Sequence, residues 1–328
     1  LGFTDRGSHT VLTVYPGHEL ANNYSLNTVD ICPVGALTSN DFRFQMRVWF
    51  MKETKTIDVN CATGANVTVY SREDKIYRIT PRQNNDVNSD WMPDSHRLNF
   101  HWIESDARLT DPLICDGENH RLATWQEALA TSADKLAGLE GGEIAVIASA
   151  RMTNEELLMT NRLIKHLGAG HVDTVTRMGE ADGYLISADR NPNTNGVKLI
   201  LGLDDPGSQI ELIKEGIEQG RIKAVIALQE NLVEDADFSA ELLGKLDFLL
   251  TSYPLANPTA DVAHVVLPSA GWAEKSGTMI NVTGRLQRLN KVIDGPGLTL
   301  EAWEIVRDLI QATGGGNGIY SVTDIFTH

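Results

Sequence analysis

The second half of the chain alternates continuously apolar segments with segments that carry helix-start and helix-stop signals. Ile144–Ala148 reads I-A-V-I-A, as a strand covered on both faces would. A helix is predicted next, because Thr153 and Glu156 have the spacing of a capping box and Gly168 supplies a stop. Strands that alternate with helices in this way favour a parallel sheet with helices on both faces, an α/β fold.

The other predicted elements of this half continue the pattern. A second capping box is expected at Ser208 and Glu211, with Gly220 ending its helix. A terminal helix is predicted over residues 301–313. Further apolar runs are predicted strands, at residues 197–203, 222–228, 248–251 and 262–267.

The first part of the chain has the pattern of β-structure with long loops. Residues 10–15 form a predicted strand that stops at Pro16-Gly17. Phe42, Phe44 and Met46 alternate with polar residues, which indicates a half-buried strand. Two apolar-rich runs, at residues 66–71 and 75–80, flank a short polar loop and predict a hairpin. Residues 83–99 are expected to be irregular.

The composition is that of an acidic chain. The 328 residues include 28 Lys and Arg against 44 Asp and Glu, a formal net charge of -16. This balance argues against a nucleic-acid partner, because binding to phosphate backbones needs clustered basic residues. No apolar run approaches the roughly 20 residues of a membrane helix, so direct membrane insertion is not expected. Three cysteines in this length indicate a reducing compartment.

Cys32 stands directly before Pro33 at the end of a short apolar run. In bacterial ferredoxins the last cysteine of a cluster-binding run also precedes a proline, and the thiolate is the ligand that iron requires. A buried structural cysteine is the other interpretation of the same dipeptide. The sequence contains no C-x-x-C, so this chain alone cannot complete a cluster or a structural zinc site.

Motifs for nucleotide binding and for hydrolysis are missing from the sequence. There is no G-x-x-x-x-G-K-[ST] and no G-x-S-x-G, and Gly168-Ala169-Gly170 lacks the third glycine of a dinucleotide fingerprint. The pairs His96/His101 and His166/His171 are five residues apart, which does not place both on one helical face. We therefore expect structural or surface histidines and no catalytic acid, base or nucleophile.

Residues 27–38 (N-T-V-D-I-C-P-V-G-A-L-T) resemble the large iron–sulfur subunit of respiratory NADH:quinone oxidoreductase, complex I, and Ser39, Phe42, Phe44, Arg47 and Trp49 continue the likeness. The resemblance implies that Cys32 is the last ligand of a four-iron four-sulfur (4Fe-4S) cluster. Its three other cysteines, and further iron–sulfur clusters, would then lie upstream of Leu1. Residues 1–41 would be the C-terminal part of a ferredoxin-like iron–sulfur domain.

Residues 57–66 resemble a segment that binds an additional cluster in this family through C-x-x-C-x-x-x-C and a later cysteine. The four corresponding positions are Asp58, Cys61, Ala65 and Pro93. Alanine and proline cannot ligate iron, and one thiolate cannot hold a cubane. The resemblance therefore implies that this cluster has been lost, that residues 42–110 form a small β-rich scaffold, and that Cys61 is a half-buried thiol.

Residues 108–113 and 125–129, together with residues 273–287, resemble molybdopterin oxidoreductases. The resemblance implies that residues 111–328 form a shortened, parallel-sheet α/β domain of that type. No cysteine follows Cys115 to coordinate a metal, so no molybdopterin is expected. A molybdenum-dependent enzyme such as a formate dehydrogenase stays open as a competing interpretation.

The function implied by these resemblances is that of an electron-transfer and scaffold subunit without a catalytic site of its own. It would relay electrons from NADH and flavin through iron–sulfur clusters toward quinone. Partners would include the NADH- and flavin-binding subunit, with a peripheral location on the cytoplasmic side of the inner membrane or the mitochondrial matrix side. Two alternatives remain: a subunit of an NAD-linked hydrogenase or formate dehydrogenase complex, and a cofactor-free structural subunit.

Overall fold

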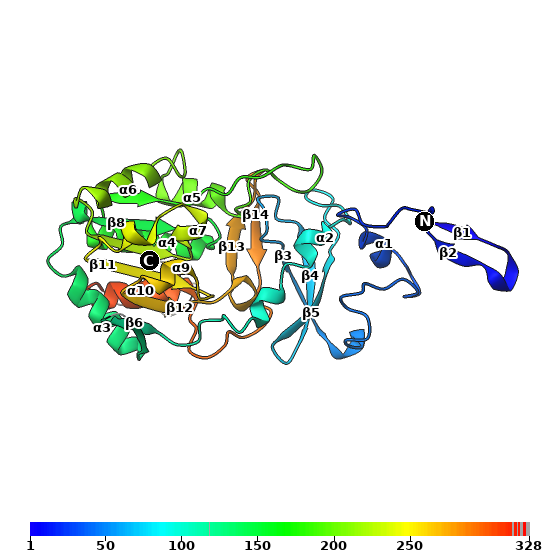
Figure 1. The fold of residues 1–328 in the computed structure, drawn as a ribbon, viewed down its shortest axis with the longest axis horizontal. Coiled ribbons are helices and arrows are strands. Elements are labelled where there is room, and N and C mark those ends of the chain that lie inside the picture. Colours follow the sequence, from blue (N-terminus) through cyan, green and yellow to red (C-terminus); the bar gives the residue numbers. More distant parts are fainter. Residues whose placement is uncertain (118, 317, 320, 322–323, 326–328) are drawn as a thin grey trace.

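The computed structural model describes residues 1–117, 119–316, 318–319, 321 and 324–325. It is elongated, with a large α/β lobe at one end, a small β module in the middle and a thin N-terminal hairpin at the other end (Figure 1). The hairpin β13 (Gly277–Ile280) and β14 (Leu286–Leu289) lies between the lobe and the β module. The large sheet of the lobe and the small sheet of the β module are therefore joined by the hairpin β13–β14.

The lobe is built on a seven-stranded sheet of order β7-β6-β12-β11-β10-β8-β9. Neighbours from β12 to β9 run parallel, as predicted for the lobe, whereas β6 and β7 form an antiparallel edge, and none of β6, β7 and β9 is among the predicted strands. The sheet is therefore mixed. Its strands are β6 (Leu113–Asp116), β7 (Asn119–Leu122), β8 (Ile144–Ala148), β9 (His171–Asp173), β10 (Ala224–Leu228), β11 (Phe248–Tyr253) and β12 (Val265–Pro268).

Helices cover both faces of this sheet. Successive residues of β8 point to opposite faces, so that Val146 enters one apolar core and Ile147 the other. The central strands β8, β10, β11 and β12 are buried on both sides, whereas the edge strands β7 and β9 are more exposed. The helices are α3 (Trp125–Leu136), α4 (Asn154–Leu167), α5 (Thr194–Leu201), α6 (Ile210–Glu218), α7 (Leu232–Asp235), α8 (Ala240–Leu243), α9 (Pro258–Asp261) and α10 (Ala302–Ala312).

The β module is an antiparallel sheet of order β3-β4-β5. Its strands are β3 (Lys52–Ile57), β4 (Asn66–Arg72) and β5 (Lys75–Pro81), and the last two are the predicted hairpin. Glu73 and Asp74 close it with φ angles of 53° and 57°, the left-handed conformation that a two-residue hairpin loop requires. A short helix, α2 (Asp94–Arg97), interrupts the region predicted as irregular.

The N-terminal part has little regular structure. Strands β1 (Gly2–Thr4) and β2 (Val11–Thr13) form an antiparallel hairpin, and β2 confirms the strand predicted over residues 10–15. The short helix α1 (Asn27–Asp30) follows and leads directly to Cys32. Among the described residues, no helix has both the length and the apolar content to cross a membrane.

Three predictions about local structure are wrong. Residues 197–203 are not a strand, because α5 covers most of them and its Val197 is buried while its Leu199 is 73% exposed, as on an amphipathic helix. Residues 42–46 form turns, and Phe44 is 91% exposed with a φ of 64°. Ser208 does not cap α6; instead the carboxylate of Asp173 accepts from the N–H groups at the start of that helix.

Other predictions are confirmed. Thr153 accepts from the Glu156 N–H while the Glu156 side chain accepts from the Thr153 N–H, so the first capping box forms. Gly168 ends α4 in the left-handed conformation, and α10 is the predicted terminal helix. The proposed boundaries after residues 41 and 110 stay predictions.

Candidate metal centre

Cys32 lies at the start of a loop that points backbone N–H groups toward its sulfur. The Cys32 N–H still donates to the carbonyl of Val29 at 3.2 Å, which continues the turn of α1. Pro33 has no N–H, and Gly35 turns the chain with a φ of 64°. Hydrogen bonds from the backbone of Leu37, Val34, Ala36 and Gly35 lower the pKa of the Cys32 thiol. The loop therefore favours the thiolate, the form that binds iron.

The helix that carries Cys32 is fixed to the β module by a buried side chain. Asn27 is 3% exposed, and its Nδ2 donates to the carbonyl of Met92 at 2.8 Å while its Oδ1 accepts from the Met92 N–H at 3.0 Å. The guanidinium of Arg97 donates to the same Oδ1 at 3.2 Å and pairs with Asp30 at 2.7 Å. Because these groups are shielded from water, the network holds α1 in one position.

A second set of contacts holds the chain just before α1. The Asp94 carboxylate accepts from the Leu26 N–H at 3.0 Å, and the Asp94 N–H donates to the carbonyl of Asn23 at 2.6 Å. The Tyr24 hydroxyl donates to the carboxylate of Asp182, which belongs to the α/β lobe. Sequence reasoning did not find these partners, because residues about 70 or more positions apart in the sequence leave no local pattern.

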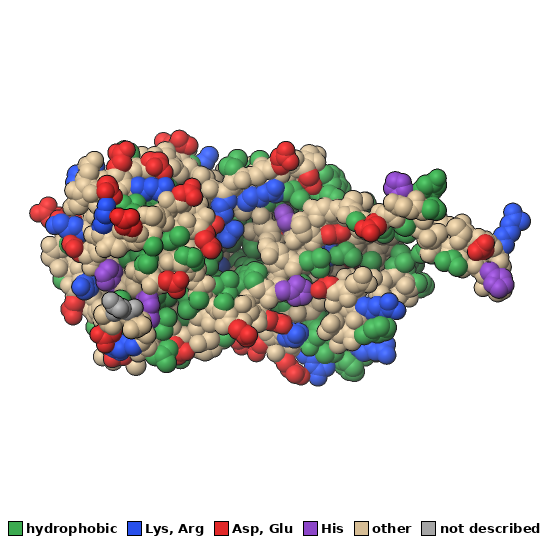
Figure 2. Space-filling model, viewed as in Figure 1, with side chains coloured by type: hydrophobic (Ala, Val, Ile, Leu, Met, Phe, Trp, Pro, Cys, Tyr) green, Lys and Arg blue, Asp and Glu red, His purple; other side chains and the backbone are tan. Residues whose placement is uncertain are grey.

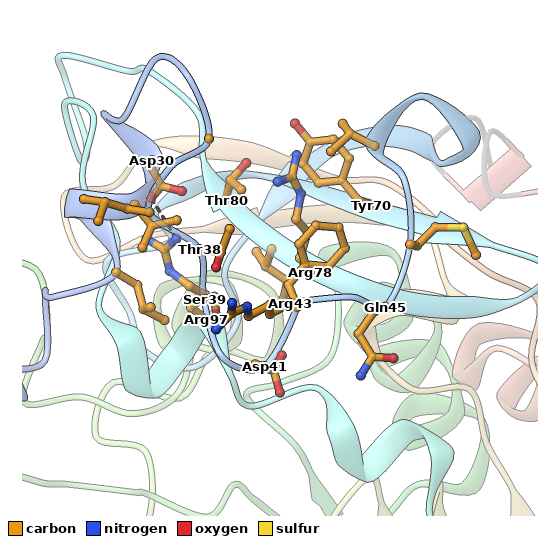
Figure 3. A pocket seen from close by; sticks show the side chains of 18 of the residues that line it. Asp30, Thr38, Ser39, Asp41, Arg43, Gln45, Tyr70, Arg78, Thr80 and Arg97 are labelled. Atoms are coloured by element: carbon orange, nitrogen blue, oxygen red, sulfur yellow. Dashed lines mark ion pairs between the residues drawn. The ribbon is translucent and has the colours of Figure 1, made fainter. Parts of the chain in front are cut away.

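A large open pocket of about 1080 Å³ lies between the Cys32 loop, residues 41–50 and the strands β4 and β5. In Figure 3 the ion pair of Asp30 and Arg97 lies on one side of this pocket, while Tyr70 and Arg78 come from the strands. Trp49 is 73% exposed at its rim. Figure 2 shows hydrophobic and Lys or Arg side chains together on this part of the β module, whereas acidic side chains are scattered over the lobe.

The four positions at which the resemblance predicts a lost cluster, Asp58, Cys61, Ala65 and Pro93, are all buried. Asp58, 4% exposed, contacts the Nδ1 of His96 at 2.6 Å, and its N–H donates to the Ala65 carbonyl at 2.8 Å. Pro93 is buried and forms the N-cap of α2, the helix that carries His96. Cys61 is fully buried, not half-buried, because its Sγ lies against the Leu185 carbonyl at 3.7 Å.

The Cys61 thiol lies in surroundings that make it unreactive. Burial, followed by the neighbouring Asp58 carboxylate, raises the pKa of the Cys61 thiol, so the thiolate is disfavoured there. His96 is held by its carboxylate partner. Within the part of the chain that the structure describes, no three His, Cys, Asp or Glu side chains are grouped so that they could hold a metal ion.

The α/β lobe has a topological switch point, the place in the strand order at which such folds bind cofactors. Strand β9 follows β8 on one side, while β10 lies on the other side, and ligands of α/β sheets bind at the carboxyl ends of strands where the order reverses in this way. Glu230, which follows β10, is fully buried there. The guanidinium of Arg177 binds it and also pairs with Asp235 at 2.6 Å.

These residues do not fit a phosphate-bearing pterin cofactor. Phosphate needs N–H groups and cations, whereas the switch point holds the buried carboxylate of Glu230, and Arg177 is committed to two carboxylates. Burial raises the pKa of Glu230, and the adjacent Arg177 charge offsets part of that effect. We derive no chemistry from molybdopterin for this chain.

Comparison with known proteins agrees with this geometry. Residues 1–38 match the ferredoxin-like domain of NADH-quinone oxidoreductase subunit 3, and residues 51–101 match the NADH-ubiquinone oxidoreductase NDSU1/NuoG-like 4Fe-4S domain. A solved structure, acetylene hydratase from Pelobacter acetylenicus, has a similar fold with a TM-score of 0.53 at 11% identity, covering 84% of this chain and 70% of that one.

Two relatives show how much of a longer protein is matched. The 78 kDa subunit of mitochondrial NADH-ubiquinone oxidoreductase from Candida albicans is 26% identical over 94% of this chain and 59% of its own length. An NADH-quinone oxidoreductase subunit from Rickettsia felis is 36% identical over 52% of this chain and 25% of its own length. The chain thus spans less than two thirds of either relative. Because the molybdopterin oxidoreductase model matches residues 108–197 and 194–312, the chain belongs to the molybdopterin oxidoreductase family.

Proposed function

We propose that this chain is part of an electron-transfer and scaffold subunit of an NADH:quinone oxidoreductase, with Cys32 as the ligand of a 4Fe-4S cluster. The observation that carries the proposal is the position of the Cys32 thiol, which is partly exposed, follows the anchored helix α1 and lines the large open pocket, while the backbone of its loop lowers its pKa. The two matched iron–sulfur domain models and the names of the relatives support the same function. The other three ligands and further clusters would come from outside the described residues.

When bound, a 4Fe-4S cluster supplies one-electron oxidation and reduction. The residues of this chain set its position and its surroundings. Cys32 supplies one thiolate, and the N–H groups of Val34 to Leu37 stabilise negative charge at the sulfur, which favours the reduced state. Asn27 and Arg97 hold the ligand in place relative to the β module.

The rest of the proposal concerns cofactors, partners and place. The region of Asp58, Cys61, Ala65 and Pro93 would hold no cluster, and the α/β lobe would brace the assembly without molybdopterin. The partners would be other subunits of a redox complex, including the NADH- and flavin-binding one, and not nucleic acid. The location would be peripheral, on the cytoplasmic side of the inner membrane or on the matrix side, without membrane insertion.

The test replaces Cys32 with alanine in the full-length protein within its assembled complex. We expect the loss of one low-temperature EPR signal and of roughly four iron atoms per complex, because a cubane that loses a thiolate ligand is no longer held. The matched control is Cys115→Ala, since Cys115 is a partly exposed thiol on β6 in the lobe. An unchanged spectrum in the Cys32 variant would refute the ligand assignment.

The same preparation separates the competing functions. A complex that is colourless before any substitution would favour the cofactor-free structural subunit. Hydrogen- or formate-dependent reduction of NAD⁺ by the complex would favour the hydrogenase or formate dehydrogenase alternatives. Quinone reduction that depends on NADH and decreases in the Cys32 variant is the result expected from our proposal.

A further inference from the structure

A second, smaller pocket lies where the β module meets the hairpin β13–β14. Its volume is about 280 Å³. Figure 1 shows the hairpin beside β3, between the β module and the lobe. The residues that line it and matter for binding are Lys55, Asn66, Arg82, Arg285, Gln287 and Arg288. Junctions between domains are frequent places for ligand sites.

Hydrogen bonds from both sides fix the walls of this pocket. The Asn290 side chain donates to the Lys55 carbonyl at 2.8 Å, and the Gln287 Nε2 donates to the Gly64 carbonyl at 2.9 Å. At the other end of the hairpin, the Thr278 N–H donates to the Glu155 carboxylate of α4 at 2.8 Å. The hairpin is therefore attached to the β module and to the lobe, and the pocket has a fixed shape.

The pocket is strongly basic in a chain whose net charge is -16. Four of its lining residues are cationic, namely Lys55, Arg82, Arg285 and Arg288. Arg285 pairs with the exposed Asp86 at 2.8 Å. In the described part of the chain, no acidic side chain pairs with Lys55, Arg82 or Arg288. The unpaired cations that line this one pocket repel one another, and an anion between them would relieve that repulsion.

Two buried donors and one buried acceptor among the lining residues have no partner in the described part of the chain. The donors are the Nδ2 of Asn66 and the Nε of Arg82, and the acceptor is the Oε1 of Gln287. Arg82 Nη2 donates to the Asn66 Oδ1 at 2.6 Å, which fixes the amide so that its Nδ2 stays free. A buried polar atom without a partner costs about 1–3 kcal/mol, so a ligand that satisfies these atoms would be stabilised.

We propose that this pocket binds a phosphate group, best as inorganic phosphate that still carries a proton. Its oxygens accept from Arg82 and Asn66 and pair with Lys55 and Arg288, as oxyanions do with guanidinium and ammonium groups. Its O–H donates to the otherwise unpaired Gln287 Oε1. The bound anion joins the β module to the hairpin and thereby stabilises the junction.

The test measures the melting temperature of the full chain against phosphate at constant ionic strength maintained with sodium chloride. We expect a saturable rise, and a smaller rise with sulfate, because sulfate has no proton to donate to Gln287 at neutral pH. The double variant Lys55→Gln/Arg288→Gln should bind phosphate roughly tenfold more weakly or worse, since charge-assisted hydrogen bonds are lost. Both side chains are exposed, so the variant is expected to fold.

Lys52→Gln is the matched control, because Lys52 is also exposed on β3 but does not line the pocket. It should respond to phosphate as the unaltered chain does. No phosphate effect beyond that of sodium chloride, equal effects of sulfate and phosphate, or an undiminished response of the double variant would each overturn the proposal. Titration with ADP identifies the source: tighter binding than phosphate supports a nucleotide's phosphates, and weaker binding supports free phosphate.

Discussion

The Asn27 amide makes several of the buried contacts that attach the Cys32 helix to the β module, and Asn27→Ala should loosen that attachment. The substitution removes both hydrogen bonds to the backbone of Met92 and the acceptor used by Arg97. Met92 is 1% exposed, so its N–H and carbonyl cannot turn to water without local opening. The seven-stranded sheet makes no use of these bonds, so we expect a local effect.

The magnitude follows from the two backbone groups left unpaired. Each buried polar group without a partner costs about 1–3 kcal/mol, so the pair amounts to about 2–6 kcal/mol. At 1.4 kcal/mol per tenfold change, local opening of the segment around α1 should become roughly 30- to 20,000-fold more frequent. The amides of Asp30, Ile31 and Cys32, which donate within this turn, should exchange faster by that factor.

Hydrogen–deuterium exchange with mass spectrometry measures this directly in peptides that cover residues 24–40. The control is Asn290→Ala, which removes one side-chain hydrogen bond to Lys55 far from α1 and should leave these peptides unchanged. Exchange of the α/β lobe should also stay unchanged in the Asn27 variant. If exchange over residues 24–40 stays within about twofold of the unaltered chain, this amide does not hold the Cys32 loop.

Two further predictions concern buried charges where the hairpin and α10 meet α4. Lys275 pairs with Glu156 at 2.7 Å, and their side chains are 3% and 1% exposed. Lys275→Met should therefore lower the free energy of unfolding, measured in urea, by about 3–5 kcal/mol. Adding Glu156→Gln should recover most of that loss, and additive effects of the two substitutions would contradict the argument. Burial, followed by the neighbouring Glu156 charge, raises the pKa of Glu301 from 4.5 to about 7. The Glu304 charge raises this pKa further, whereas Lys275 and the Trp303 N–H lower it. Native Glu301 therefore keeps its proton between these two pH values, so stability falls as the pH rises through that window and the loss is complete above about pH 7. The size of this pKa shift sets an upper bound of about 3 kcal/mol on the stability lost across the window, and partial exposure reduces the expected loss to roughly 1–2 kcal/mol. Glu301→Gln should remove this dependence, and urea titrations at pH 5 and pH 8 that retain it would show that another group is responsible.

Several elements were predictable because their evidence is local. The capping box at Thr153, the hairpin of β4 and β5 and the helix α10 each depend on neighbouring residues, and all three form. The strand prediction for residues 197–203 was wrong because its evidence is not local. A short apolar run is compatible with either a buried strand or one face of a helix, and only its packing in the lobe decides.

Some features of the candidate site were likewise predictable from neighbouring residues. Cys32 stands directly before Pro33, a pattern that fits either a cluster ligand or a structural cysteine, and the resemblance of residues 27–38 to a complex I subunit is what implies the ligand role, which stays a prediction. The alternation of strands and helices likewise determined an α/β lobe, since period and punctuation are properties of the chain. These features could be derived without coordinates.

Tertiary structure alone decided what surrounds them. Asn27 reaches Met92 across 65 positions, and Asp58 reaches His96 across 38, and neither pairing leaves a periodic trace in the sequence. The basic pocket joins Lys55 of β3 to Arg288 of β14, which chain folding brings together. Burial gives the Asn27 and Asp58 contacts their strength, because a charge or an amide shielded from water has no partner but the one that the fold supplies.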